Sequence, residues 1–259
     1  VFPNFILENR RISKPEDFAS LPRVIHYSPS SIQIEAQCQG GISFLFTIFF
    51  PEPEVLTGSI QIKNLKQIPR NIILQLAVNL VPMGKGQPSH PDKSGVNQFL
   101  TGKTDQIEPV LFMTGGPTAI NNPFPALSIE LGFVARGMQE LSWVLVSKKR
   151  KSESFEKAKQ TINSGWQKAL NQHIIHHEAQ IIDIKTGNKD WDATFFLSQV
   201  NADTHLLKYQ EDYDLPHFIK IRLPDRSSIS DNVETPSATL TNLEFNHLRQ
   251  VILPAKVDL

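Results

Sequence analysis

The sequence predicts an antiparallel β-sandwich over residues 1–150, followed by a helical segment over residues 151–259. Up to the end of the first range, apolar residues alternate with polar ones at the period-two spacing of strands, and turn residues separate these runs. Beyond Lys151 the apolar spacing changes to three or four residues, which is the period of an amphipathic helix. Because no helical pattern separates the strand-like runs, we expect them to pair antiparallel in a sandwich.

The strand-like runs of the first range are rich in β-branched and aromatic residues. They cover residues 31–35, 42–50, 59–63, 72–81, 127–131 and 141–146. Between them lie groups of residues that favour turns, at 51–53, 64–66, 84–88, 115–117 and 121–123. The connection from 81 to 116 is long for a hairpin, so we expect it to be functional or to hold irregular structure of its own.

Three helical stretches are predicted in the second range. The first begins near Ser152 and runs past Trp166 without interruption, with Ser152 or Ser154 as its cap. The others run from about residue 193 to 208 and from about 240 to 252. Three amphipathic helices cannot close a helical ring, so we interpret the chain as a fragment of a larger protein.

The composition is that of a globular protein without surplus charge. Twenty-six basic residues stand against 26 acidic ones, so no nucleic-acid partner is expected, because phosphate contacts need excess positive charge. The basic run at 148–151 is interpreted as a solvated linker, with a nuclear signal or nucleic-acid patch as the alternative. The one cysteine, Cys38, excludes an internal disulfide and is expected to be buried.

No apolar run approaches the 18 residues of a membrane-spanning helix, so no membrane partner is expected. The chain begins at Val1 without a methionine, so the sequence does not distinguish a cytoplasmic from a secreted protein. The oligomeric state is equally open.

Several short motifs stand in a recognisable order along the chain, at 60–64, 109–116, 186–192, 215–219 and 222–225. With the sandwich, the basic linker and a long helix with a central Trp, this order resembles the six-hairpin glycosidases of the glucoamylase and α-glucosidase type. The resemblance implies an N-terminal β-supersandwich joined to an (α/α)6 barrel. Residues 151–259 would then supply only the opening helices of that barrel.

The resemblance also implies a chemistry. Such enzymes use two carboxyl groups, one to protonate the leaving oxygen and one to activate water or to attack the sugar. The substrate would be an oligosaccharide, α-linked by the resemblance alone, and no cofactor is expected. The general acid would lie beyond Leu259 in the remainder of the catalytic barrel, so no catalytic residue is assigned in this chain. The alternative is a non-catalytic carbohydrate-binding or structural β-sandwich module.

Four residues are predicted to border the sugar site: Trp191, Asp192, Arg222 and Asp225. Trp191 offers a stacking face at the start of a helix, and the charged side chains offer partners for hydroxyls. Pro216 favours an extended path that could return Arg222 and Asp225 to the same end of the helical layer. In the alternative interpretation Asp190 caps the helix, Trp191 fills the core, and Arg222 forms a local ion pair with Asp225.

The sequence favours neither a zinc site nor a serine hydrolase. His173, His176, His177 and Glu178 lie at helical spacing, and two such histidines can share a zinc ion. Their order lacks the metalloprotease pattern and they fall at the end of a predicted helix, so no metal site is predicted. A serine hydrolase is not expected either, because the sequence has no Gly-x-Ser-x-Gly elbow.

Overall fold

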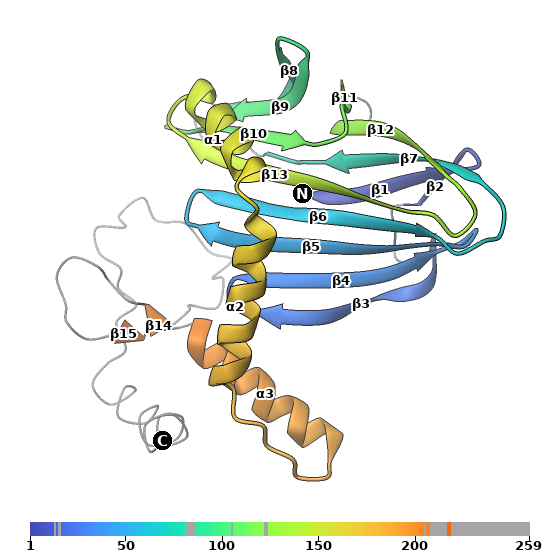
Figure 1. Cartoon of the computed structure of the whole chain (residues 1–259). Helices are drawn as coiled ribbons and strands as arrows, with labels where there is room; N and C mark the ends of the chain where they lie inside the picture. The colour runs from blue at the N-terminus through green and yellow to red at the C-terminus, as the bar shows by residue number, and fades with distance from the viewer. Residues whose placement is uncertain are drawn as a thin grey trace, which may run out of the picture. The chain divides into compact units, whose positions relative to one another are not determined.

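The computed structural model describes residues 1–12, 14, 17–80, 86–104, 106–121, 124–204, 206–207 and 217–218 (Figure 1). The chain divides into two compact units, Val1–Ile174 and Ile175–Leu259, and each is described by itself. Most of the described secondary structure belongs to the first unit and consists of two antiparallel sheets.

The smaller sheet has the strand order β11-β12-β7-β1-β2. Its strands are β1 (Phe2–Leu7), β2 (Arg10–Ile12), β7 (Arg70–Ala77), β11 (Thr118–Asn121) and β12 (Pro125–Phe133). The central strand β7 pairs with β12 over eight residues and with β1 over six, both antiparallel.

The larger sheet has the order β3-β4-β5-β6-β13-β10-β9-β8. Its strands are β3 (Phe18–Ser28), β4 (Ser31–Cys38), β5 (Ile42–Glu52), β6 (Val55–Asn64), β8 (Gln87–Ser94), β9 (Asn97–Lys103), β10 (Glu108–Met113) and β13 (Met138–Lys148). The two edges are β3, whose pairing with β4 has three register shifts, and β8. The antiparallel sandwich followed by helices that the sequence predicted is thereby confirmed.

The long connection predicted between residues 81 and 116 is instead regular structure over much of its described length. It holds the hairpin of β8 and β9 and then β10. The sequence pattern does not predict β8, Gln87–Ser94. An edge strand has one partner and needs few apolar residues, and apart from two prolines this strand has only polar side chains.

The core lies between the two sheets and follows the alternation of the strands. Along β13, Leu141 and Trp143 face the smaller sheet, whereas Val144 and Val146 belong to a cluster on the opposite face. Trp143 is fully buried and stacks on Phe46 of β5 with ring centroids 5.4 Å apart. Buried Cys38 lies in the same core, as expected.

Two helices cover the outer face of the larger sheet (Figure 1). α1 (Lys151–Asn163) places Phe155 against Phe99, with ring centroids 4.7 Å apart. It also buries Ala158 on the valines of β13. α2 (Trp166–Gln180) begins in the first unit, where Trp166 and Leu170 pack on Phe49 of β5. The outer face is therefore covered over β5, β6, β13, β10 and β9, whereas the edge strand β3 stays largely exposed.

The single helix predicted across Trp166 is two helices. The chain breaks at Ser164 and Gly165, where Gly165 has a φ of +71°, a left-handed conformation that glycine adopts readily at a helix end. The prediction missed the break because Ile162 and Trp166 keep helical spacing across it. The predicted cap is wrong as well, because α1 starts at Lys151 and Ser154 is buried within it.

The buried Ser154 side chain joins α1 to two strands. Its Oγ donates a hydrogen bond to the Glu108 carbonyl at 2.7 Å and accepts one from the Lys148 amide at 2.9 Å. The domain boundary predicted at residue 150 falls in this short connection from β13 to α1 and stays a prediction.

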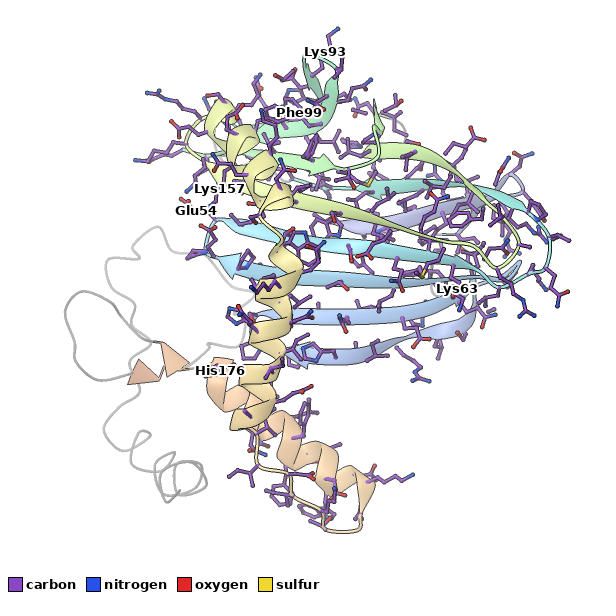
Figure 2. All side chains as sticks on the ribbon, in the orientation of Figure 1. Glu54, Lys63, Lys93, Phe99, Lys157 and His176 are labelled. Carbon is purple, nitrogen blue, oxygen red and sulfur yellow. The ribbon has the colours of Figure 1, made fainter. Side chains whose placement is uncertain are left out.

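The basic run at 148–151 is engaged with acidic neighbours. Lys148 pairs with Glu54, and Lys151 pairs with Asp92 at 2.7 Å. Nearly two helical turns further on, Lys157 pairs with Glu52 at 2.6 Å. Figure 2 shows Lys157 and Glu54 at the same end of the larger sheet. These ion pairs hold the start of α1 against the strand ends.

The second unit contains the end of α2, α3 (Lys189–Thr204), and the short antiparallel pair β14 (Leu206–Leu207) and β15 (His217–Phe218). α3 corresponds to the helix predicted at 193–208 but starts four residues earlier. The helix predicted at 240–252 lies outside the described residues. No described helix is both long enough and apolar enough to cross a membrane.

Replacing Ser154 with alanine should lower the free energy of unfolding by about 1–3 kcal/mol, because it leaves the part-buried Lys148 amide and Glu108 carbonyl without these hydrogen bonds. Ser152→Ala, at an exposed position of the same helix, is the matched control and should change stability by less than about 0.5 kcal/mol. Urea unfolding of both variants measures the difference, and equal losses would contradict the role given to Ser154.

Candidate functional site

The loop that precedes α3 is organised by its own polar side chains. Asn188 Oδ1 accepts hydrogen bonds from the amides of Asp190 at 2.9 Å and Trp191 at 3.4 Å. The Asp192 amide makes the first helical bond, to the Asn188 carbonyl at 2.9 Å. The capping residue is therefore Asn188, and the alternative in which Asp190 caps the helix is wrong. An asparagine before the first helical residue is a common cap, so the motif at 186–192 contained this signal.

Asp192 closes the same loop from within the helix. One carboxylate oxygen, Oδ1, accepts the Thr186 hydroxyl at 2.6 Å and the Thr186 amide at 2.7 Å. These two hydrogen bonds, with a smaller contribution from the charge of Lys185, hold the pKa of Asp192 below its ordinary value. Near neutral pH, Asp192 is thus an ionised acceptor.

Asp192 also lines a hollow of about 350 Å³ in the second unit. Its other walls are Phe196 of α3, Glu178 at the end of α2, and the connecting segment 181–185. Gln199 fixes that segment, since its side-chain amide exchanges hydrogen bonds with the backbone of Ile182 at 2.8 and 3.0 Å. Three carboxylates, one ammonium group and four apolar side chains line the hollow: Glu178, Asp183, Asp192, Lys185, Ile181, Ile182, Ile184 and Phe196.

Trp191 is a surface residue. Its side chain is 60% exposed, and its ring lies against Phe195 with centroids 6.2 Å apart. Trp191 does not fill a core, as the alternative interpretation held, and it does not line the hollow beside Asp192. Phe196, five residues further along the helix, is also 40% exposed, whereas Val200 is fully buried.

Arg222 and Asp225 lie outside the described residues. The shared site of Trp191, Asp192, Arg222 and Asp225 therefore stays a prediction. Of these four residues, the structure describes the two at the start of α3, one on the open surface and one in the wall of a hollow.

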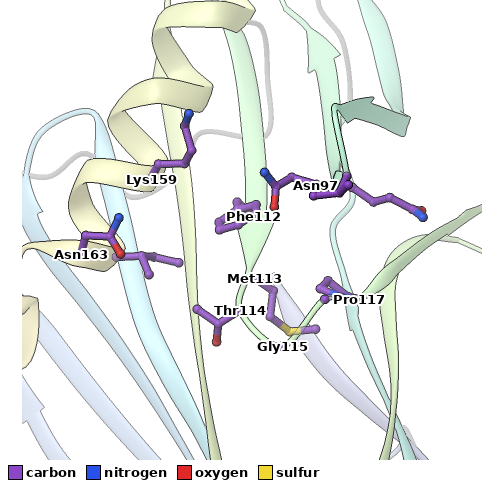
Figure 3. Close-up of a pocket in the computed structure, with 12 residues that line it drawn as sticks. Asn97, Phe112, Met113, Thr114, Gly115, Pro117, Lys159 and Asn163 are labelled. Carbon is purple, nitrogen blue, oxygen red and sulfur yellow. The ribbon is translucent and has the colours of Figure 1, made fainter.

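A second hollow, of about 340 Å³, lies on the first unit (Figure 3). Residues from the start of β9, the connection between β10 and β11, and α1 form its walls. In that connection Gly115 has a φ of +90°, a backbone conformation that favours glycine, and a Cβ there would come within 2.9 Å of the ends of the Ile129 and Leu141 side chains. The motif at 109–116 ends here, although the sequence did not indicate a site.

The histidine group does not form a metal site in the described part of the chain, where no group of three or more His, Cys, Asp and Glu side chains could hold an ion. His173 has a packing role, with its ring edge against Phe49 at a centroid distance of 5.4 Å.

Comparison with solved structures identifies proteins with a similar fold. A protein described as a kojibiose phosphorylase, from the human microbiome, aligns with a TM-score of 0.54 and 15% identity, over 77% of this chain and 31% of that chain. A bacterial glucoamylase complexed with acarbose aligns with a TM-score of 0.55 and 13% identity, over 79% of this chain and 35% of that chain. No protein-family model matches the sequence, and no curated protein matches it.

At these identities the likeness shows a shared fold. This chain has the antiparallel sandwich and following helices of the N-terminal portion of both proteins, and it spans about a third of the length of each. The resemblance predicted from the order of the sequence motifs is thereby confirmed at the level of the fold.

The two bonds from Thr186 should be visible in the titration of Asp192. NMR of the carboxyl carbon should give a midpoint below the ordinary value of 3.8, and Thr186→Val should move the midpoint towards that value. Since the pKa is lowered in the folded state, the stabilisation of this loop is present above pH 3.8 and is lost as the pH falls through the lowered midpoint.

Thr194→Val is the matched control, because the Thr194 hydroxyl donates to the backbone carbonyl of Asp190 and not to a carboxylate. An unchanged Asp192 midpoint in Thr186→Val, or the same change in both variants, would contradict the cause assigned to the shift.

Proposed function

We propose that this chain is the N-terminal part of an enzyme that acts on glycosidic bonds. The observation that carries the proposal is the alignment of more than three quarters of the chain with a kojibiose phosphorylase and a glucoamylase. The alignment covers 77% and 79% of the chain, so it extends beyond the sandwich. A sandwich alone serves many functions, so a match that extends beyond it is the more informative one.

In its narrower form the proposal is hydrolysis of α-linked oligosaccharides by two carboxyl groups, without a cofactor. One group protonates the leaving oxygen, and the other activates water or attacks the sugar. The chain covers only 31% and 35% of the two matched proteins, which supports a general acid in the barrel beyond Leu259. The partners of this chain are then the saccharide and the remainder of that barrel.

Trp191 and Asp192 are the described residues that we assign to sugar binding, together with Arg222 and Asp225. An exposed indole offers a flat apolar face on which the C–H face of a sugar ring can stack. The free oxygen of an ionised carboxylate accepts hydrogen bonds from hydroxyls, and a charge-assisted bond of this kind is stronger than a neutral one.

The second candidate is a non-catalytic carbohydrate-binding or structural module. It is favoured by the completeness of the first unit, which has two packed sheets and helices over the outer face of the larger one. The hollow shown in Figure 3 belongs wholly to that unit.

The product of the intact gene should release sugars from members of a panel of α- and β-linked oligosaccharides, assayed with and without inorganic phosphate. Free sugar formed without phosphate supports hydrolysis, and a sugar phosphate formed only with phosphate replaces hydrolysis by phosphorolysis. Turnover of β-linked members alone overturns the α-preference. No turnover of any member returns the protein to the module interpretation.

In the same intact protein, Asp192→Ala should lower kcat/KM by about 10–100-fold, because it removes a charge-assisted hydrogen bond to the sugar. The variant also loses the two exposed hydrogen bonds from Thr186, so its thermal unfolding midpoint should fall slightly, and the loss of activity should far exceed the loss of stability. Asp190→Ala, two residues earlier in the same helical turn, is the control and should leave kcat/KM within about twofold. A loss of stability without a loss of kcat/KM would give Asp192 a purely structural role.

A further inference from the structure

The hollow on the first unit has the size and position of a small-molecule site. Its volume of about 340 Å³ is at the lower end of the range of about 300–1,000 Å³ that is usual for ligand pockets. Three segments far apart in the sequence form it: the tip of the β8–β9 hairpin, the connection after β10, and the last turns of α1.

An aromatic ring and two primary amides converge on this space. The Phe112 ring, on β10, is held edge-on by Phe155 with centroids 5.9 Å apart, so its orientation is fixed. Asn97 projects from β9 towards α1 above Phe112, and Asn163 stands on the α1 side (Figure 3). Within the part of the chain that the structure describes, neither amide group has a hydrogen-bond partner.

The walls of the hollow are held by bonds that leave these amides available. The Thr114 hydroxyl accepts the Ser142 amide at 2.9 Å and donates to the Ser142 carbonyl at 3.2 Å. Gln98 Oε1 accepts the Ala119 amide at 2.8 Å. Such preorganisation reduces the entropy lost when a ligand is bound.

The charges around the hollow favour a neutral ligand. No carboxylate lines it, so it offers nothing to a divalent cation. Its one ammonium group, Lys159, pairs with Glu156 at 2.7 Å and lies 4.9 Å from the centroid of the Phe155 ring. Primary amides both donate and accept hydrogen bonds, which matches hydroxyl groups, since hydroxyls also do both.

We propose that this hollow binds a neutral sugar ring of an oligosaccharide, as a subsite on the sandwich. The ring stacks on Phe112, while Asn97 and Asn163 hold its hydroxyls from opposite sides. The choice of a saccharide among neutral hydroxylated ligands rests on the proposed function, whereas the location and the polarity of the site do not.

The test uses the 259-residue chain with maltotetraose and cellotetraose as the probes, followed by amide NMR at millimolar saccharide. At least one probe should shift the amide signals of Gly115 and Gly116, which line the hollow. The double variant Asn97→Ala/Asn163→Ala should weaken binding at least about tenfold, since it removes two hydrogen-bonding groups. Both residues are exposed, so the variant should keep the wild-type unfolding midpoint.

Gln67→Ala supplies the control, because Gln67 is an exposed amide in the connection between β6 and β7 and should not affect binding. The subsite is overturned if neither probe shifts these signals, if the shifts lie only outside the hollow, or if the double variant binds like the wild type. If the intact protein turns over oligosaccharides but no probe binds in this hollow, only the subsite proposal is contradicted. If a probe binds in the hollow but the intact protein turns over no oligosaccharide, only the proposed enzymatic function is contradicted.

Discussion

The architecture depends on the need to bury both faces of the central strands of the eight-stranded sheet. Alternation along these strands sends large apolar side chains in both directions, as with Phe46 towards the smaller sheet and Phe49 towards α2. Each such side chain contributes about 1.5–3 kcal/mol only when it is removed from water, so the outer face requires a cover as much as the inner one. α1 and the first turns of α2 are therefore integral to the sandwich unit, and ion pairs and Ser154 fix where that cover begins.

In the loop before α3 and around the hollow on the sandwich, a few polar side chains form the hydrogen bonds that the fold requires. Neighbouring side chains remain available for binding. In the loop before α3, Asn188 and Asp192 accept hydrogen bonds from the local backbone amides and from the Thr186 hydroxyl, and the exposed side chain of Trp191 has no part in that network. On the sandwich, the side chains of Thr114 and Gln98 form hydrogen bonds that hold the fold, whereas the side-chain amides of Asn97 and Asn163 form none within the described structure. Exposed side chains of this kind contribute little to the free energy of folding, so a role in binding accounts for them better.

Much of the sandwich could be predicted from the sequence, because period-two alternation is strong wherever a strand has at least one buried face. The predicted runs at 42–50 and 141–146 lie wholly inside β5 and β13. The prediction failed at the polar edge strand β8, where burial leaves no pattern, and it also left out β1, β2, β3, β9, β10 and β11. It failed again where a helical stripe continued across the glycine at 165. The hollow on the sandwich was missed for a different reason. Asn97 and Asn163 meet only through the tertiary fold, and neither belongs to a local motif.

The two edge strands of the larger sheet have a consequence for the chain during synthesis. An unpaired edge can template strands of another molecule, which is the first step of aggregation. Here β3 contains Pro22 and three register shifts, and β8 contains Pro88 and Pro91. Proline offers no amide hydrogen to an incoming strand, and shifts in register break the regular spacing that such a strand would need. The sheet can thus reach eight strands within one polypeptide while its ends resist growth between polypeptides.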